Sequence, residues 1–325
     1  MTATPLHFHT TTTAPLNKIF EWTQKDHRVA LATVINTWGS APRPAGSFLV
    51  IRDDGKFEGS VSGGCVEGDV IANAQEVIEN NQSKLLTYGV SNDDAWSLGL
   101  ACGGKITVLI EPVGNDLMSY LKLASHFDQS RTAYAFIQDP DIGTIGLEEY
   151  QTAQTIPYDD NHFINIIHPP KRLFVIGAVH IAKHLAPMAK QTGFDVTIID
   201  PRSSFTDQDG FDGITMITDW PDDVLSDISP DQHTALVTLT HDPKLDDAAL
   251  LTWLGGDTLP YYIGCLGSQK THAARVNRLI AAGIDKEIID TIDGPVGIDI
   301  GAKGPEEIAV SILAQTIAHY RKPRF

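Results

Sequence analysis

Arg172-Leu-Phe-Val-Ile-Gly-Ala-Val-His-Ile-Ala182 is the stretch that decides how this chain folds. Its apolar run, residues 173–176, stops at Gly177, and a segment with helical spacing follows. A second apolar run starts at Val196 and ends in a carboxylate, Asp200. Strand, glycine turn, helix, strand and acid form the first βαβ unit of nucleotide-binding domains, where the acid follows the glycines by ~20 residues. The stretch therefore predicts a Rossmann-like domain.

The glycine turn departs from the dinucleotide-binding pattern at one position. That pattern is G-x-G-x-x-G/A, and this chain has Gly177, Val179 and Ala182 at the three positions. The second glycine lets a pyrophosphate approach the backbone, and the β-branched side chain of Val179 obstructs that approach. NAD(P) is therefore a disfavoured ligand, and a Rossmann scaffold whose cleft holds another ligand, or none, stays open as an alternative.

Downstream of this unit, short apolar runs alternate with helical segments, which is typical of a doubly wound parallel sheet with helices on both faces. Pro187 lies inside the first helix, expected over residues 181–191, and should kink or shorten it. Ligands of such sheets bind beyond the carboxyl ends of the strands. A His or Asp at a turn is more often a cap than a catalytic group, but several loops should converge here. The predicted cleft residues are Gly177, His180, Asp200, His241, Asp242 and Ser268.

Length and composition set the number of domains and exclude some functions. The 325 residues suggest a disordered Thr-rich tail over residues 1–14 and two domains, residues 15–168 and 169–325. The formal net charge of -17 argues against nucleic-acid binding, which needs clustered Lys and Arg. No stretch has the pattern of a signal peptide or a membrane span. Three cysteines form no disulfide framework, so we expect a cytoplasmic protein with reduced thiols.

The first domain has the pattern of an α+β fold, with strands, hairpins and helices in mixed order. Helices are expected over residues 16–25, 66–80 and 115–126, and strands over residues 29–37, 47–52, 56–61, 105–111, 132–137, 144–150 and 163–167. Arg43 lies on a loop constrained by proline and glycine, where its fork suits an anionic ligand, although a surface arginine beside a turn is equally compatible with the pattern.

Two cysteines of this domain lie beside Gly-Gly pairs. In Ser62-Gly-Gly-Cys65 the glycines precede a helix, where free backbone N–H groups suit an anion and the helix dipole lowers the pKa of a thiol. Buried, inert cysteines are the common alternative, but two in matching surroundings favour a functional site. No C-x-x-C spacing indicates structural zinc. The predicted site residues are Gly63, Gly64, Cys65, Cys102, Gly103 and Gly104.

Taken together, these motifs resemble the XdhC/CoxI family, accessory proteins in the maturation of molybdenum hydroxylases such as xanthine dehydrogenase. The resemblance runs from about residue 15 to 320. It is carried by Gly39-Ser-Ala-Pro-Arg-Pro-Ala-Gly46, Ser62-Gly-Gly-Cys-Val-Glu67, Leu98-Gly-Leu-Ala-Cys-Gly-Gly104, Thr240-His-Asp-Pro-Lys-Leu-Asp246, Tyr262-Ile-Gly-Cys-Leu-Gly-Ser268, Thr271-His-Ala-Ala-Arg275 and Gly294-Pro-Val-Gly-Ile-Asp-Ile-Gly-Ala302.

The resemblance implies a chaperone that binds the molybdenum cofactor, holds it for sulfuration and delivers it to a xanthine dehydrogenase-type apo-enzyme. Its partners would be that apo-enzyme and a cysteine desulfurase-type sulfur donor, and base rates favour a homodimer. Arg43 and the Gly-Gly turns suit the cofactor's phosphate. Thiolates of Cys65 and Cys102 suit molybdenum or a transferred sulfur.

Two other functions stay open besides a non-enzymatic chaperone. One is an NAD(P)-dependent oxidoreductase that uses the Rossmann cleft, with Asp200 on the ribose. The other is a pure interaction protein whose acidic surface docks a partner enzyme.

Overall fold

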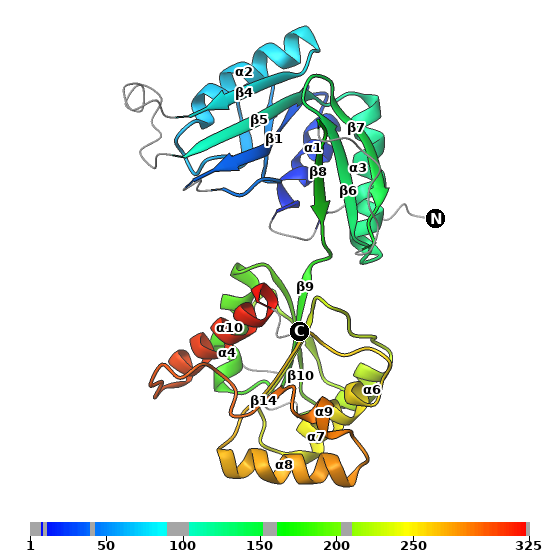
Figure 1. Cartoon of the computed structure of the whole chain (residues 1–325), viewed down its shortest axis with the longest axis vertical. Coiled ribbons are helices and arrows are strands. Elements are labelled where there is room, and N and C mark those ends of the chain that lie inside the picture. The colour runs from blue at the N-terminus through cyan, green and yellow to red at the C-terminus, as the bar shows by residue number, and fades with distance from the viewer. Residues whose placement is uncertain are drawn as a thin grey trace. The chain divides into compact units, whose positions relative to one another are not determined.

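The structure is a computed structural model, and it describes residues 8, 12–39, 43–89, 104–151, 161–202 and 210–322. The chain divides into two compact units, Met1–Pro169 and Pro170–Phe325 (Figure 1). The predicted fold class is confirmed: the first unit is an α+β domain with antiparallel sheets, and the second is a Rossmann-like domain with a parallel sheet.

The sheet of the second unit is parallel and follows the doubly wound order. Its strands are β9 (Lys171–Ile176), β10 (Phe194–Ile199), β11 (Thr215–Ile217), β12 (Thr234–Thr238), β13 (Tyr262–Cys265) and β14 (Ile292–Asp293). Their spatial order is β11-β10-β9-β12-β13-β14, which is 3-2-1-4-5-6 in chain order and matches the dinucleotide-binding fold. The order reverses between β9 and β12, so the crevice of this fold lies beyond Ile176 and Thr238.

Helices cover both faces of this sheet, as Figure 1 shows. Leu173 and Val175 face a core shared with α4 (His180–Gln191) and α10 (Pro305–Arg321). Phe174 and Ile176 face the opposite core. That core also contains residues of α6 (Pro221–Ser226), α7 (Pro243–Leu254), α8 (Gln269–Ala281) and α9 (Lys286–Ile289). Burial on both faces explains why the run at residues 173–176 is continuously apolar rather than alternating.

Helix α4 continues through Pro187 to Gln191, so of the two predicted effects, a kink or a shortening, the shortening does not occur. Proline removes one backbone hydrogen bond and crowds the preceding turn. Leu185, Ala186 and Ala189 are fully buried around it in the core of the unit. Tertiary packing therefore outweighs the local cost of the proline.

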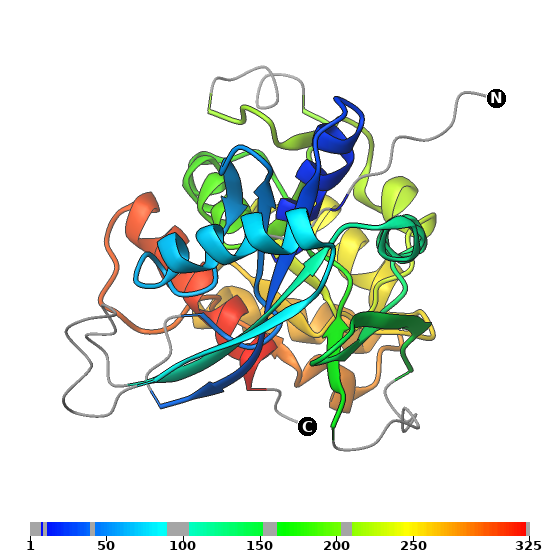
Figure 2. The ribbon, with the colours of Figure 1, turned by 90° about the horizontal axis from the view of Figure 1, so that it is seen from above.

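The first unit is built on an antiparallel sheet of order β3-β2-β1-β5-β4. Alternate residues of β1 face two different cores: Ala30, Ala32 and Val34 pack with α2, and Val29 and Leu31 with α1 and α3. In Figure 2, α2 lies over the strands of this sheet. The elements are β1 (Val29–Trp38), β2 (Phe48–Arg52), β3 (Phe57–Gly59), β4 (Lys84–Tyr88), β5 (Lys105–Pro112), η1 (Ala14–Leu16), α1 (Asn17–Thr23), α2 (Glu67–Asn80) and α3 (Asn115–Gln129).

A second sheet of order β7-β6-β8 packs with α3 in one hydrophobic core of this unit. It comprises β6 (Tyr134–Asp139), β7 (Gly143–Glu149) and β8 (Phe163–Ile167). Within the tail that we expected to be disordered, Phe8 is 1% exposed and stacks on Phe20, and its backbone bonds the Asn17 side chain at 2.8 and 3.0 Å. At Phe8 the expectation therefore does not hold, because the aromatic ring gains a place in the core.

Candidate functional site

The loop between β3 and α2 wraps around the carboxylate of Glu67. This carboxylate accepts hydrogen bonds from four consecutive backbone N–H groups, those of Val61 (3.2 Å), Ser62 (2.9 Å), Gly63 (3.0 Å) and Gly64 (2.8 Å). The hydroxyls of Ser60, at 2.8 Å, and Ser62 donate to it as well. The predicted anion-binding arrangement is thus present, but the anion that it holds is a side chain of the same chain.

The hydroxyl oxygen of Ser62 completes the loop by accepting from the N–H groups of Cys65 and Val66, both at 3.0 Å. All six N–H groups from residue 61 to 66 are therefore used internally. This corrects the prediction that the N–H groups of Gly63 and Gly64 are free for an anionic ligand. Gly63 and Gly64 have φ of 77° and 115°, values that L-residues rarely adopt, so the loop depends on glycine at both positions.

The environment of Glu67 keeps it ionised. Burial alone would raise the pKa of this carboxyl, since only 8% of the residue is exposed. The hydrogen bonds from Ser62 and Ser60 outweigh burial and lower the pKa of Glu67 to about 2. Glutamate at a helix start, reaching back to preceding N–H groups, was the available sequence signal for this arrangement.

The structure places the remaining predicted residues of the first unit as follows. Cys65 is half-buried at the end of the Gly-Gly turn, and a Cβ built on Gly64 would meet no atom within 4 Å, so the space beside the loop is open. Arg43 is half-buried and its Nε has no hydrogen-bond partner among the described residues. Gly104 is buried next to β5. Cys102 and Gly103 lie outside the described residues.

At the switch point of the second unit, the Gly177 turn touches the loop after β12. Gly177 has φ +107°, and a Cβ there would lie 2.5 Å from Cγ2 of Thr240. Glycine is therefore required both for the backbone conformation and for the close approach of the two loops.

Asp200, the predicted ribose ligand, is fully buried and bound to its own chain. Its carboxylate accepts from the backbone N–H of Ala178 at 2.9 Å and of Arg202 at 3.0 Å. The guanidinium of Arg202 forms a two-pronged pair with it, at 2.8 and 2.7 Å. Burial would raise the pKa of Asp200, but these hydrogen bonds lower it overall. A carboxylate has about four acceptor sites, so a ribose hydroxyl would have to displace one of these donors.

Asp242 and Ser268 act as helix caps. The carboxylate of Asp242 accepts from the N–H of Lys244 at 3.0 Å at the start of α7, and the hydroxyl of Ser268 accepts from the N–H of Thr271 at 3.1 Å at the start of α8. The two predicted histidines, His180 and His241, are exposed. Among the predicted cleft residues, Gly177 thus lies beside the loop that holds Asp242. Asp200 is hydrogen-bonded to the Gly177 turn through the N–H of Ala178.

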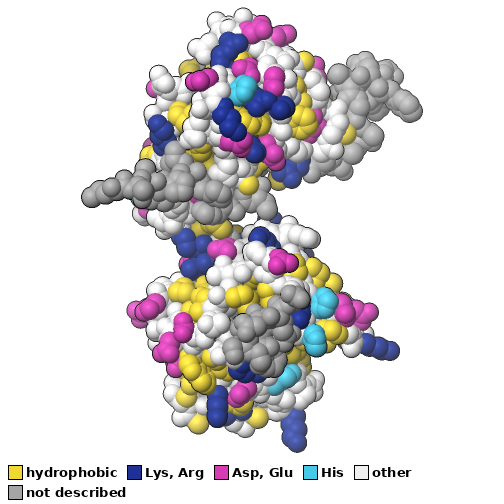
Figure 3. All heavy atoms as spheres, turned by 180° about the vertical axis from the view of Figure 1, so that it is seen from behind, with side chains coloured by type: hydrophobic (Ala, Val, Ile, Leu, Met, Phe, Trp, Pro, Cys, Tyr) yellow, Lys and Arg dark blue, Asp and Glu magenta, His cyan; other side chains and the backbone are white. Residues whose placement is uncertain are grey.

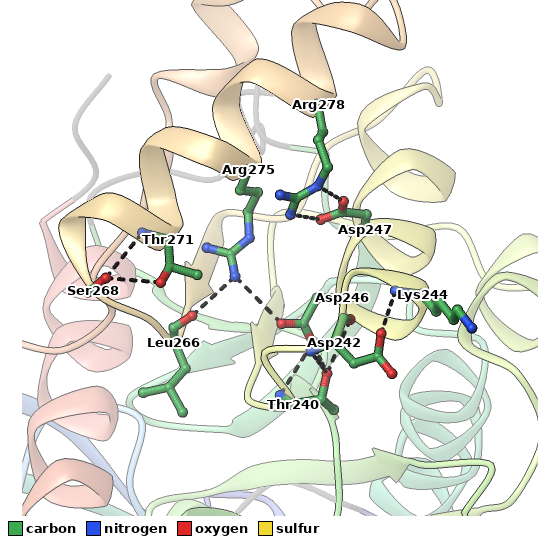
Figure 4. A network of polar contacts seen from close by, with 10 residues as sticks. All are labelled: Thr240, Asp242, Lys244, Asp246, Asp247, Leu266, Ser268, Thr271, Arg275 and Arg278. Atoms are coloured by element: carbon green, nitrogen blue, oxygen red, sulfur yellow. Dashed lines mark hydrogen bonds and ion pairs between the residues drawn. The ribbon is translucent and has the colours of Figure 1, made fainter.

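Sequence reasoning missed a buried ion pair beside these loops, which Figure 4 shows. Asp246 accepts from the hydroxyl and the N–H of Thr240, at 2.6 and 3.3 Å, and its other oxygen lies 3.5 Å from Nη2 of Arg275. That Nη2 also donates to the carbonyl of Leu266 at 3.1 Å. Burial raises the pKa of Asp246 despite the Thr240 hydrogen bond and the Arg275 charge. The available signal was the register of Arg275, four residues before the buried Leu279 of α8.

The third cysteine, Cys265, ends β13 and is fully buried. Burial raises the pKa of its thiol to about 11, so the sulfur stays protonated near neutral pH. This environment is that of a packing cysteine rather than a nucleophile or metal ligand.

Two negative findings apply to the described part of the chain. No helix there is both long and apolar enough to cross a membrane. No group of three or more His, Cys, Asp or Glu side chains is placed there to hold a metal ion.

Comparison with known proteins gives matches in both units. A family model described as the XdhC and CoxI family matches residues 22–89, and one described as the XdhC Rossmann domain matches residues 173–316. A Bacillus subtilis protein, named as a probable xanthine dehydrogenase subunit, is 31% identical over 90% of this chain and 94% of its own length. The "Molybdenum cofactor insertion chaperone PaoD" of Escherichia coli is 28% identical over 88% of this chain and 81% of its own length.

A solved structure extends the likeness to the fold. A crystal structure from Bacillus halodurans, described as a xanthine dehydrogenase, superposes with a TM-score of 0.78 at 27% identity and covers 95% of this chain and 96% of that one.

Proposed function

Because the chain belongs to the XdhC/CoxI family, we propose that it is a chaperone that holds the molybdenum cofactor and passes it to a molybdenum hydroxylase. The observation that carries this proposal is the likeness to the insertion chaperone PaoD, which extends over 88% of this chain and so includes both units. The proposal includes sulfuration of the cofactor while it is held, a cysteine desulfurase-type sulfur donor, a homodimeric state and a cytoplasmic location.

The residues present fit parts of this cargo and not others. The cofactor carries a phosphate, a pterin and a soft metal bound through sulfur. Cys65, half-buried beside open space, suits the soft end, whereas the buried and protonated Cys265 does not. The N–H groups of residues 61–64 do not suit the phosphate, because Glu67 occupies them. Arg43, with its unpartnered Nε among the described residues, suits it better.

One observation favours a second candidate function, an NAD(P)-dependent oxidoreductase. The strand order of the second unit is that of dinucleotide-binding domains. Two features of the first βαβ unit weigh against it. Val179 stands at the N-cap of α4, where a glycine normally admits the pyrophosphate, and the acceptor sites of Asp200 are already occupied. We therefore place this function second.

A pure interaction protein is the third reading, and it would use the acidic surface. The formal net charge is -17, but on the face that Figure 3 shows, acidic and basic side chains are interspersed. On that face the charge distribution gives no single docking patch, so we regard partner binding as part of cofactor delivery.

The chaperone function is tested by delivery. The full chain, loaded with isolated cofactor under anoxic conditions, is mixed with apo-xanthine dehydrogenase, and the hydroxylase activity that appears is followed over time. We expect faster activation than with free cofactor, and at least tenfold weaker cofactor binding (~1.4 kcal/mol) in a Cys65→Ala, Cys102→Ala variant.

Cys265→Ala is the matched control, because its thiol is buried and protonated and should not contact the cofactor. A double variant that binds and delivers like the wild type would remove the thiols from the proposal. Wild-type protein that never accelerates activation would remove the chaperone function itself.

A further inference from the structure

Arg275 heads the largest fully buried side chains of the described residues, with 1% of the residue exposed. A guanidinium carries five N–H donors. Nη2 donates to the carbonyl of Leu266 and faces Asp246, whereas Nε and Nη1 have no hydrogen-bond partner among the described residues. Buried charges are normally both paired and hydrogen-bonded, so three unused donors on a buried cation call for a ligand.

Two neighbouring arginines show what a completed pair looks like. Arg202 forms a two-pronged pair with Asp200, and Arg278 forms one with Asp247. Asp246 does not serve Arg275 in this way, because one of its oxygens is bonded to Thr240 and the other is 3.5 Å from Nη2 without a hydrogen bond. The planar fork of Arg275 is therefore available on its Nε and Nη1 sides.

The position of Arg275 in the fold is that of a ligand site. The residue reaches from α8 toward the carboxyl ends of β12 and β13, and in Figure 4 the guanidinium lies between Leu266, Asp246 and the first turn of α8 at Thr271. Ligands of doubly wound sheets bind at this edge, and helix N-termini there favour anions.

The half of the sheet that carries the glycine turn and the half that carries β12 and β13 differ in whether their donors are free to bind an anion. In the first half, the N–H of Ala178 on the glycine turn is occupied by Asp200. In the second half, Nε and Nη1 of Arg275 have no hydrogen-bond partner among the described residues. An anionic group is therefore better accommodated beyond β12 and β13 than on the glycine turn.

We propose that the carboxyl edge of β12 and β13 binds a phosphate or pyrophosphate group through Nε and Nη1 of Arg275. Because Arg275 is buried, binding requires the segment from Leu266 to Ser268 to move aside, and Gly267 lies at its centre. The phosphate of the molybdenum cofactor is one source of this group, which rests on the proposed function, and a free nucleotide is another.

The test is a titration of the ¹⁵N-labelled full chain with inorganic pyrophosphate, observed at the Nε–H resonance of Arg275. We expect a saturable shift of this resonance, and at least tenfold weaker binding in Arg275→Lys, which keeps the charge but loses the fork. Arg278→Lys is the control and should bind like the wild type, because its guanidinium is already paired with Asp247. The wild-type titration alone decides the matter if Arg275→Lys does not fold.

No shift of the Arg275 resonance at about 10 mM pyrophosphate, ten times the ~1 mM of very weak binding, would overturn the proposal. The same titration with isolated cofactor and with CMP identifies the source of the phosphate. A pyrophosphate shift, with no binding of the cofactor anywhere on the chain, would keep the site and count against the chaperone function. Cofactor binding, with Arg275 unshifted by both the cofactor and pyrophosphate, would keep the function and contradict this site.

Discussion

Replacing Asp246 with alanine is expected to lower the free energy of unfolding of the second unit by about 3–5 kcal/mol. The reason is that Arg275, 1% exposed, would lose its only charged contact among the described residues and remain as an uncompensated buried cation. Thr240 would lose the nearer acceptor of its hydroxyl, at 2.6 Å, at the same time. The loss of unfolding free energy is measured by urea unfolding of the full chain. Hydrogen exchange of the β12 and β13 amides, measured separately, assigns that loss to the second unit.

The neighbouring residue provides a matched control. Asp247, whose side chain is 12% exposed, pairs with Arg278, whose side chain is 40% exposed; because Asp247→Ala leaves Arg278 in contact with water, it should cost less than about 1 kcal/mol. A double variant with Asp246→Leu and Arg275→Met should recover most of the stability, because apolar replacements of a buried pair are often neutral. Equal losses of unfolding free energy in Asp246→Ala and Asp247→Ala would show that the buried pair of Asp246 and Arg275 contributes no more to stability than the partly exposed pair.

Replacing Glu67 with glutamine is expected to cost about 3 kcal/mol and to loosen the Gly-Gly-Cys loop. An amide directs two donors at a ring of N–H and hydroxyl donors that now converge on a carboxylate. The size of this expected loss follows from the pKa of Glu67, which is lowered from 4.5 to about 2. Each pKa unit corresponds to 1.36 kcal/mol. Hydrogen exchange of the amides of residues 61–64 gives the local readout.

The pH dependence follows from the same pKa. A carboxyl whose pKa is lower in the folded chain stabilises the fold above its unfolded pKa near 4.5, and this contribution is lost as the pH falls toward 2. The wild type should therefore lose more stability than Glu67→Gln between these two values. Glu79→Gln, an exposed position on the same helix, should behave like the wild type. Equal acid sensitivity of wild type and Glu67→Gln would contradict this account of the loop.

The sequence was most informative where local pattern and tertiary packing agree. The run at residues 173–176, the glycine at 177 and the acid at 200 predicted the Rossmann-like unit, because a buried parallel strand needs apolar residues on both faces. The edge strand β4 was missed, since its side chains are half-exposed and Leu85 is 41% exposed, which leaves little apolar periodicity. The short strand β14 has only two residues and carries no period at all.

The site was less predictable, because pattern alone does not tell which partner a polar group finds. The glycines at 63 and 64 suggested N–H groups free for an anionic ligand, but nothing in their spacing says that Glu67 of the same chain occupies those groups. Asp200 had the expected spacing, yet it binds the chain's own Arg202. Asp246 and Arg275 are 29 positions apart in the sequence, and only the packing of α7 beside α8 brings them together.

The central claim is that this chain carries the molybdenum cofactor, and its most direct test is binding. Isolated cofactor is mixed with the full chain under anoxic conditions, with NAD and NADP as competitors, and molybdenum that co-elutes with the protein on gel filtration is measured. The account predicts that molybdenum co-elutes and that neither nicotinamide displaces it. Absence of molybdenum from the protein fraction, together with measurable binding of NAD or NADP, would contradict the claim and make the Rossmann cleft a dinucleotide site.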